Sequence, residues 1–381
     1  MKRLVSISIG TPILSLLFSI TVLYQPTKTA QAATSGGYTS AAQSFYISIT
    51  ASNLDSWMSG AGTYYGCTVA SYEPASELVN FNFGEQYWTP SGWYTKDLGG
   101  YPLTDNQIIQ GVEDYISAWY AYCSTGNSGH TLNVMVNVNN SSSYQNAAPL
   151  PSTISFSTEV NTYGSGNNWA DVVNTLNQWS YNTYGSLTYG SDDFEPDWST
   201  ESDVDNWINQ YTAAADYASF LGFGGSADGC YGNQLVMYYY PSATDSGCNN
   251  SWSALGIFDI MDANGYGFVE PQQYNQSVNN VTISNTGQVV QLQPQAVQYA
   301  NILNYGYQVR GYLPMLNVTM TQYLACQQVG VQNCSGIDNT PPTAWDYMYL
   351  ALADGDNYVA VDDIENGMWV YNAGTDMGWT N

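Results

Sequence analysis

The stretch Leu187-Thr-Tyr-Gly-Ser-Asp-Asp-Phe-Glu-Pro-Asp-Trp198 begins as a short apolar and aromatic run and ends in four acidic residues. Residues two apart on a strand point to the same side, about 7 Å apart along the backbone. Asp193, Glu195 and Asp197 therefore face one way if the strand continues that far, whereas Pro196 predicts that it ends earlier. Carboxylates crowded at a strand end disfavour joint ionisation, so the pKa of one group rises and that group can act as an acid. A solvated acidic loop or a calcium site is the alternative interpretation.

Strands and helices are predicted to alternate on both sides of this stretch. The predicted strands are the run up to the acidic stretch and residues Thr63–Tyr72, Val79–Phe83, Leu132–Val138, Phe220–Phe223, Gln234–Tyr240, Ala254–Asp259, Tyr312–Thr319 and Tyr358–Val361. Five helices are predicted. The first follows a capping box of Thr104 and Gln107, the second starts near Asn168, and the third carries Val204 to Ala215. The fourth begins at Pro294, and the fifth covers Thr343–Leu352.

Close to eight strands, several of them ending in acidic or amide residues, favour one α/β domain over residues 33–381. We therefore expect a single (β/α)8 TIM-like barrel with long loops and disulfides, whose site lies at the C-terminal ends of its strands. An open doubly wound sheet is the alternative fold.

Residues Met1–Ala32 have the pattern of a secretory signal peptide. Lys2 and Arg3 form the charged start, Ile13–Leu23 the apolar middle, and Ala30-Gln-Ala32 a small-residue cleavage site. Removing 32 of the 381 residues leaves a mature chain of 349. We expect this chain to be secreted, extracellular and monomeric, with no membrane contact after cleavage.

The mature chain is poor in basic residues rather than rich in acids. It keeps only Lys96 and Arg310 against 31 acids, a net charge of 2 − 31 = −29. Protonated carboxylates would leave almost no self-repulsion and few ion pairs to lose, which is typical of a protein for acidic surroundings. The shortage of cations excludes a nucleic-acid partner. A lone His130 argues against a Ser-His-Asp triad or a histidine metal site.

Six cysteines in a secreted chain predict three disulfides, although spacing does not decide how they connect. Proximity along the chain favours Cys230–Cys248 and Cys326–Cys334, which leaves Cys67 with Cys123.

The segment Asp193-Phe-Glu-Pro196 resembles the strand-four motif of glycoside hydrolase barrels. In chitinase-type barrels and barrel-fold muramidases, an Asp-x-Glu segment there carries the catalytic carboxylates, and a Glu-Pro pair marks the acid/base of the large retaining clan. Met237-Tyr-Tyr239 and Gly367-Met-Trp369 are weaker echoes of chitinase-type segments. Ser191 stands where the chitinase pattern has an aspartate. The chain is also similar to secreted bacterial barrel proteins without an assigned activity.

The resemblance implies a glycoside hydrolase with Glu195 as its acid and Asp193 beside it. Phe268-Val-Glu-Pro271 echoes the same motif, so Glu270 is the first choice for a second carboxylate, with Glu85 and Asp259 as alternatives. Retaining enzymes need two carboxyl groups about 5 Å apart and inverting enzymes about 6.5–9.5 Å.

Aromatic residues are abundant and could stack on sugar rings. The predicted substrate-binding residues are Trp88, Trp198, Tyr239, Trp252 and Trp369, three of them in predicted loops. We expect a secreted, acid-tolerant glycoside hydrolase acting on a neutral polysaccharide or cell-wall glycan; a non-catalytic carbohydrate-binding protein of the cell surface is the alternative. No cofactor is expected, apart from a structural calcium ion that Asp262–Val269 could hold.

Overall fold

The computed structural model describes part of the chain. The described residues are 38–47, 49–64, 76–96, 101–123, 131–140, 154–196, 198–216, 220–223, 236–237, 245, 248–263, 267–270, 279–283, 286–312, 318–321, 343, 347–348, 350–352 and 368–375. The predicted signal peptide, Cys67, His130, Asp197 and Tyr239 lie outside them.

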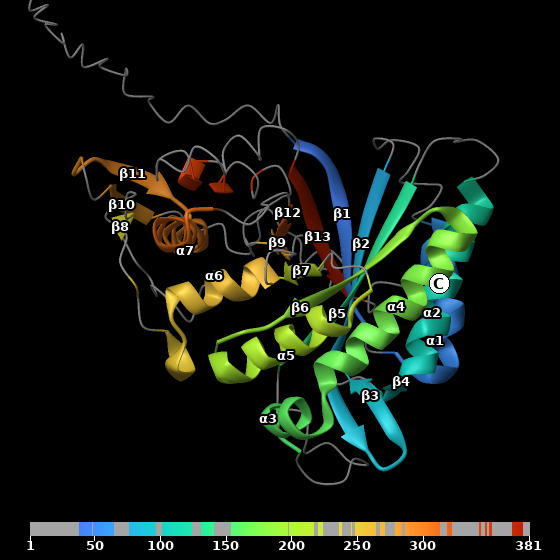
Figure 1. Cartoon of the computed structure of the whole chain (residues 1–381). Coiled ribbons are helices and arrows are strands. Elements are labelled where there is room, and N and C mark those ends of the chain that lie inside the picture. The colour runs from blue at the N-terminus through green and yellow to red at the C-terminus, as the bar shows by residue number, and fades with distance from the viewer. Residues whose placement is uncertain are drawn as a thin grey trace, which may run out of the picture. The chain divides into compact units, whose positions relative to one another are not determined.

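A parallel sheet forms the centre of the fold (Figure 1). Its strands follow the order β12 (Val318–Thr321), β13 (Met368–Thr375), β1 (Tyr38–Tyr46), β2 (Ser76–Thr89), β5 (Thr131–Asn139), β6 (Leu187–Asp193), β7 (Phe220–Phe223) and β9 (Gly267–Glu270). Every neighbouring pair on this path is parallel. The end of β2 extends beyond β5 and pairs antiparallel with β3 (Gly92–Lys96), which pairs with β4 (Leu103–Thr104). The carboxyl ends of the parallel strands therefore share one edge.

The predicted (β/α)8 barrel is wrong, because the sheet is not closed. Its two end strands, β9 and β12, lie near each other, but no ladder joins them among the described residues. Both strands have only four residues. Closure requires a consistent tilt and stagger of all strands, and alternating strand and helix patterns carry no information about either. A separate three-stranded sheet of β11 (Val289–Leu292), β10 (Asn279–Ile283) and β8 (Val236–Met237) was also not predicted.

Helices connect successive strands of the main sheet and cover it. They are α1 (Ala51–Tyr64), α2 (Asp105–Cys123), α4 (Ser165–Tyr184), α5 (Glu201–Ala214), α6 (Ala254–Asp262) and α7 (Pro294–Arg310). The predicted capping box opens α2: Thr104 N–H donates to Gln107 Oε1 at 2.8 Å, and Gln107 N–H donates to Thr104 Oγ1 at 3.3 Å. Figure 1 shows α1, α2 and α4 along one side of β2, β5 and β6.

One predicted strand is wrong, and a second lies mostly outside the described residues. Ala254–Asp259 belongs to α6, whose N-terminus is capped because Ser253 Oγ accepts the N–H of Gly256. A short apolar run does not separate a buried strand from a buried helix, and here the cap decides. The predicted strand at Thr63–Tyr72 begins inside α1 and continues outside the described residues.

The two faces of the central strands differ in chemistry. On the face toward α1 and α2, Phe81 packs edge-on against Tyr115 with ring centroids 4.8 Å apart. Asn80 and Asn82 alternate with Phe81 on β2 and point to the other face, although both are fully buried. The sheet thus has an apolar face under helices and an amide-rich face that leads to its carboxyl edge.

Cys248 is disulfide-bonded. Its predicted partner Cys230 lies outside the described residues, and so do the sulfur positions of the other cysteines. The three pairings stay predictions.

Candidate functional site

Three neighbouring strands end in a row of acidic and amide residues. Glu85 on β2 lies opposite Asn139 on β5, and Asn139 lies opposite Asp193 on β6. Adjacent strands are about 4.8 Å apart, so Glu85 and Asp193 are separated by about 10 Å of backbone. One layer deeper, the same strands place Asn82, Asn137 and Ser191 in register.

Buried amides hold Asp193 in place. Asn82 Nδ2 donates to Asp193 Oδ2 at 3.0 Å, and Asn82 Oδ1 accepts the N–H of Gly84. Ser191 Oγ donates to Asn80 Oδ1 at 3.1 Å. Asp193 is only 3 % exposed. Its carboxylate is therefore oriented by side chains of a strand more than a hundred residues away in sequence.

Glu195 lies just past the end of β6, in a turn whose backbone is fixed by Asn140. The Glu195 N–H donates to Asn140 Oδ1 at 2.9 Å, and Asn140 Nδ2 donates to the Glu195 carbonyl at 3.0 Å. Phe194 points the other way and packs edge-on against Trp207, with centroids 4.9 Å apart. The strand ends at Asp193, as Pro196 predicts, and Asp193 and Glu195 reach the same end of the sheet.

Asp192 faces away from that row and is fully enclosed. Burial raises the pKa of its carboxyl well above the usual range, the N–H of Phe194 lowers it in part, and the charge of Asp193 raises it further. Its Oδ2 has no hydrogen-bond partner. The protonated form of Asp192 is therefore favoured relative to an exposed aspartate.

Glu159 joins the site and was not predicted from the sequence. It begins a π-helical turn, η3 (Glu159–Tyr163), between the short helix α3 (Phe156–Thr158) and α4. Its side chain is fully buried, and neither carboxyl oxygen makes a hydrogen bond of normal geometry. Burial raises the pKa of Glu159 to about 9, the charge of Glu85 adds to this rise, and the backbone N–H of Trp88 opposes it. Glu159 is thus a neutral acid beside Glu85 at neutral pH.

A sequence signal for Glu159 did exist. It is the only acid between Asp114 and Asp171, and apolar Phe156 and Val160 flank it. A single acid in an otherwise uncharged amphipathic segment is a candidate for a buried carboxyl group. The proximity of Glu159 to Glu85 is a property of the tertiary structure alone.

A basic residue is paired with Glu85 across the β2–β3 ladder. Lys96 on β3 is directly across from Glu85 on β2, and it is only 6 % exposed. Directly opposed residues of an antiparallel pair point to the same face. Lys96 and Glu85 therefore lie on the same face of this strand pair.

The other predicted carboxylates have different places. Glu270 ends β9 opposite Phe223 on β7, two strands away from β6, and its side chain is outside the described part. Asp259 lies on α6, where Arg310 Nε donates to its Oδ1 at 2.8 Å and a second guanidinium nitrogen contacts its Oδ2. The structure does not bring Asp259 to the carboxyl edge of the sheet.

The predicted aromatic residues fall into three groups. Trp88 belongs to β2 rather than to a loop, is partly exposed, and stacks on Tyr163. Trp198 is partly exposed in the turn after β6. Trp252 is 2 % exposed and its indole N–H donates to the Ser199 carbonyl at 2.7 Å, so it packs in the core. Trp369 is placed only through its backbone in β13.

A second acidic cluster lines a cavity of about 570 Å³ on α5, α6 and the end of α7. It contains Asp205, Asp259, Asp262, Arg310 and Tyr312. Burial raises the pKa of Asp205 to about 6, helped by the charges of Glu201 and Asp259. The Tyr312 hydroxyl donates to Asp262 Oδ2 at 2.9 Å. Asp262 is the first residue of the predicted calcium-binding stretch. Among the described residues, no three potential ligands come close enough to share a metal ion.

Within the same part of the chain, every helix is too short or too polar to cross a membrane. Comparisons with known protein families and with curated proteins gave no match.

Proposed function

We propose that this protein hydrolyses glycosidic bonds of a neutral polysaccharide or cell-wall glycan, in acidic surroundings outside the cell. The observation that supports the proposal is the row Glu85–Asn139–Asp193 at the carboxyl ends of three adjacent parallel strands, with Glu195 two residues beyond it. Ligands of parallel α/β sheets bind at this edge. Two carboxyl groups on either side of a glycosidic bond are what its hydrolysis requires.

The proposed roles follow from position. Glu195, the only partly exposed member of the group formed by Glu85, Glu159, Asp193 and Glu195, gives a proton to the leaving oxygen. Asp193 orients it, and Glu85 takes a proton from the attacking water. The distance between the carboxyl groups of Glu195 and Glu85 would decide between a retaining reaction, at about 5 Å, and an inverting one, at about 6.5–9.5 Å. Glu270 lies the same number of strands from β6 on the other side and is the alternative base.

The surroundings of the row support a neutral substrate. The side chains around it are uncharged amides and a hydroxyl group, all of them buried: Asn80, Asn82, Asn137, Asn139 and Ser191. Lys96 is the single cation in this group and lies opposite Glu85, so a polyanionic glycan has no positive surface to bind here.

A non-catalytic carbohydrate-binding protein is the second candidate, and one observation favours it. Glu85 and Asp193 are only 2 % and 3 % exposed. Carboxyl groups that stay this buried in the presence of a glycan would hold the fold together without reaching a reacting atom.

One screen separates the two candidates. Purified protein is incubated at pH 3 to 7 with insoluble neutral polysaccharides and with peptidoglycan, and both released reducing ends and retained protein are measured. Release of sugar that disappears in Glu195→Gln supports hydrolysis. Retention on a glycan without any release supports the binding protein, and neither release nor retention overturns both.

A further inference from the structure

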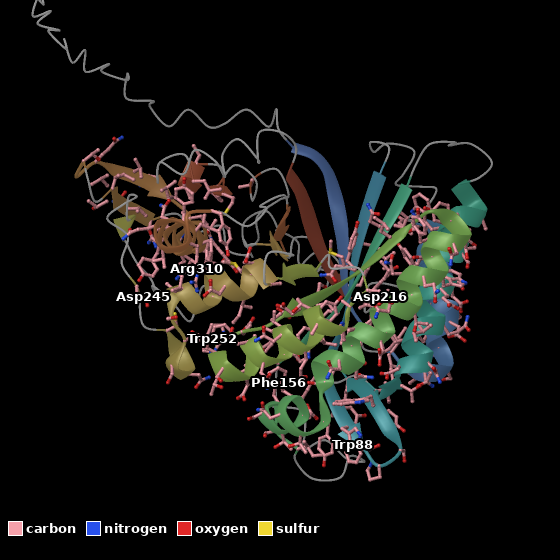
Figure 2. The ribbon with its side chains drawn as sticks, in the orientation of Figure 1. Trp88, Phe156, Asp216, Asp245, Trp252 and Arg310 are labelled. Carbon is pink, nitrogen blue, oxygen red and sulfur yellow. The ribbon has the colours of Figure 1, made fainter. Side chains whose placement is uncertain are left out.

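A pair of stacked aromatic rings lies at the same end of the sheet as the carboxyl groups. The rings of Trp88 on β2 and Tyr163 on η3 are 4.1 Å apart between centroids and 9° from parallel. Tyr163 is 36 % exposed, and Trp88 and its cross-strand partner Trp93 are partly exposed. Figure 2 shows Trp88 close to Phe156, which packs against Phe194 beside Glu195.

The chain contains a second stacked pair that serves as a comparison. Tyr120 and Tyr184 stack at 4.4 Å and 1°, joining the ends of α2 and α4. The Tyr120 hydroxyl accepts the N–H of Leu132 at the start of β5. This pair therefore fastens two helices to the amino-terminal edge of the sheet and has a structural role.

The Trp88–Tyr163 pair differs in where it lies. Trp88 follows Glu85 by three residues on the same strand, and Tyr163 closes the turn that Glu159 opens. The backbone N–H of Trp88 acts on the Glu159 carboxyl group. The two rings thus belong to the same elements as Glu85 and Glu159, and they are partly exposed where those two carboxyl groups are buried.

We propose that Trp88 and Tyr163 form a binding platform for one sugar ring of a neutral glycan. The flat face of a pyranose presents C–H groups, which pack on an aromatic face and leave the hydroxyl groups in water. Each stacked ring covers only one face of the other, and both side chains are partly exposed. The proposal rests on the proposed function, since it takes the same glycan to extend from the platform to Glu195.

The test compares two stacked pairs of the same geometry. Retention on cellulose, chitin and xylan is measured for Tyr163→Ala, Tyr163→Phe and Tyr184→Ala, all carrying Glu195→Gln to prevent turnover. We expect retention to fall by about tenfold in Tyr163→Ala, because one stacking contact is lost, and to persist in Tyr163→Phe and Tyr184→Ala. Thermal melting of each variant checks that the fold is intact.

The outcomes are distinct. Equal retention of Tyr163→Ala and the Tyr184→Ala control, or no retention of the parent protein on any of the three glycans, overturns the platform. In another outcome, retention depends on Tyr163 while the protein with Glu195 intact releases no sugar. That result supports the platform and contradicts the proposed hydrolysis.

Discussion

Carboxyl groups gather in two regions of this protein, and the two regions differ in burial and in the cations near them. At the carboxyl edge of the sheet, Glu159 is fully buried and neutral beside Glu85. On α6, Asp259 is partly exposed and bound by the guanidinium of Arg310. Figure 2 shows Trp88, at the first region, far from Arg310, at the second. An acid keeps its charge where water or a cation supports it and gives up its charge where neither does.

The protonation of buried carboxyl groups is related to the charge balance of the whole chain. Asp105, Glu113, Glu159, Asp192 and Asp205 all have raised pKa values, with burial as the largest cause in each. A chain with so few cations cannot neutralise buried carboxylates by ion pairs. Protonation does so instead, and it is most complete in acid.

The largest expected effect is a loss of turnover when a carboxyl group of the first region is changed. If the proposed hydrolysis holds, Glu195→Gln should lower turnover by about a thousandfold or more, because the amide cannot donate the proton of the leaving group. Asp216→Asn is the control, since Asp216 is exposed after α5, away from the carboxyl edge (Figure 2). Initial rates on the best glycan measure both, and near-normal turnover in Glu195→Gln would remove Glu195 as the acid.

A smaller effect tests whether Glu159 is neutral. Its pKa is about 9 in the folded protein, against 4.5 for an ordinary glutamate. Between pH 4.5 and 9 the folded state thus keeps a proton that the unfolded state releases. The contribution of protonated Glu159 to the free energy of unfolding is therefore full below pH 4.5 and is lost as pH rises toward 9. Glu159→Gln removes this dependence and should be more stable than the natural protein by about 3 kcal/mol at pH 7, with no advantage at pH 4.

Urea unfolding of both proteins at pH 4, 5.5 and 7 measures this difference. Glu113→Gln is a suitable control, because Glu113 on α2 is only partly buried and its pKa rises by a smaller amount. A stability difference that is the same at all three pH values would mean that the pKa of Glu159 is the same in the folded and the unfolded protein.

The stability of the whole protein should depend on pH in the same direction. Glu159, Asp192 and Asp205 each favour folding more as pH falls toward their ordinary values, and the window for Asp205 lies between 3.8 and about 6. We expect the midpoint of thermal unfolding to rise or hold between pH 7 and pH 3 at fixed moderate salt. Calorimetry at steps of pH measures it, and a steep fall below pH 4 would show that carboxylates with lowered pKa values dominate.

The smallest effect is expected in the exposed region. The side chains of Arg310 and Asp259 are 41 % and 34 % exposed, so water screens their ion pair. Arg310→Gln should therefore cost less than about 1 kcal/mol of unfolding free energy, and less still in high salt. A loss of several kcal/mol in denaturant unfolding would mean that this cluster is a structural centre like the buried one.

The sequence alone predicted the elements whose signals are local. Alternating residues mark β5 and β6, the Thr104–Gln107 box opens α2, and Pro196 ends the strand before Glu195. The charge balance and the shortage of cations are also properties of composition. Each of these depends on residues within a few positions of one another, where periodicity and capping act.

Tertiary structure decided the rest, because it depends on partners distant in the chain. Asn82 holds Asp193 across 111 residues, and the register of β2, β5 and β6 places Glu85 in their row. Whether a sheet closes depends on the stagger of all its strands together, so the barrel was predicted wrongly. Burial likewise made Glu159 a neutral acid, since the pKa of a carboxyl group is set by the water and charges around it and not by its neighbours in sequence.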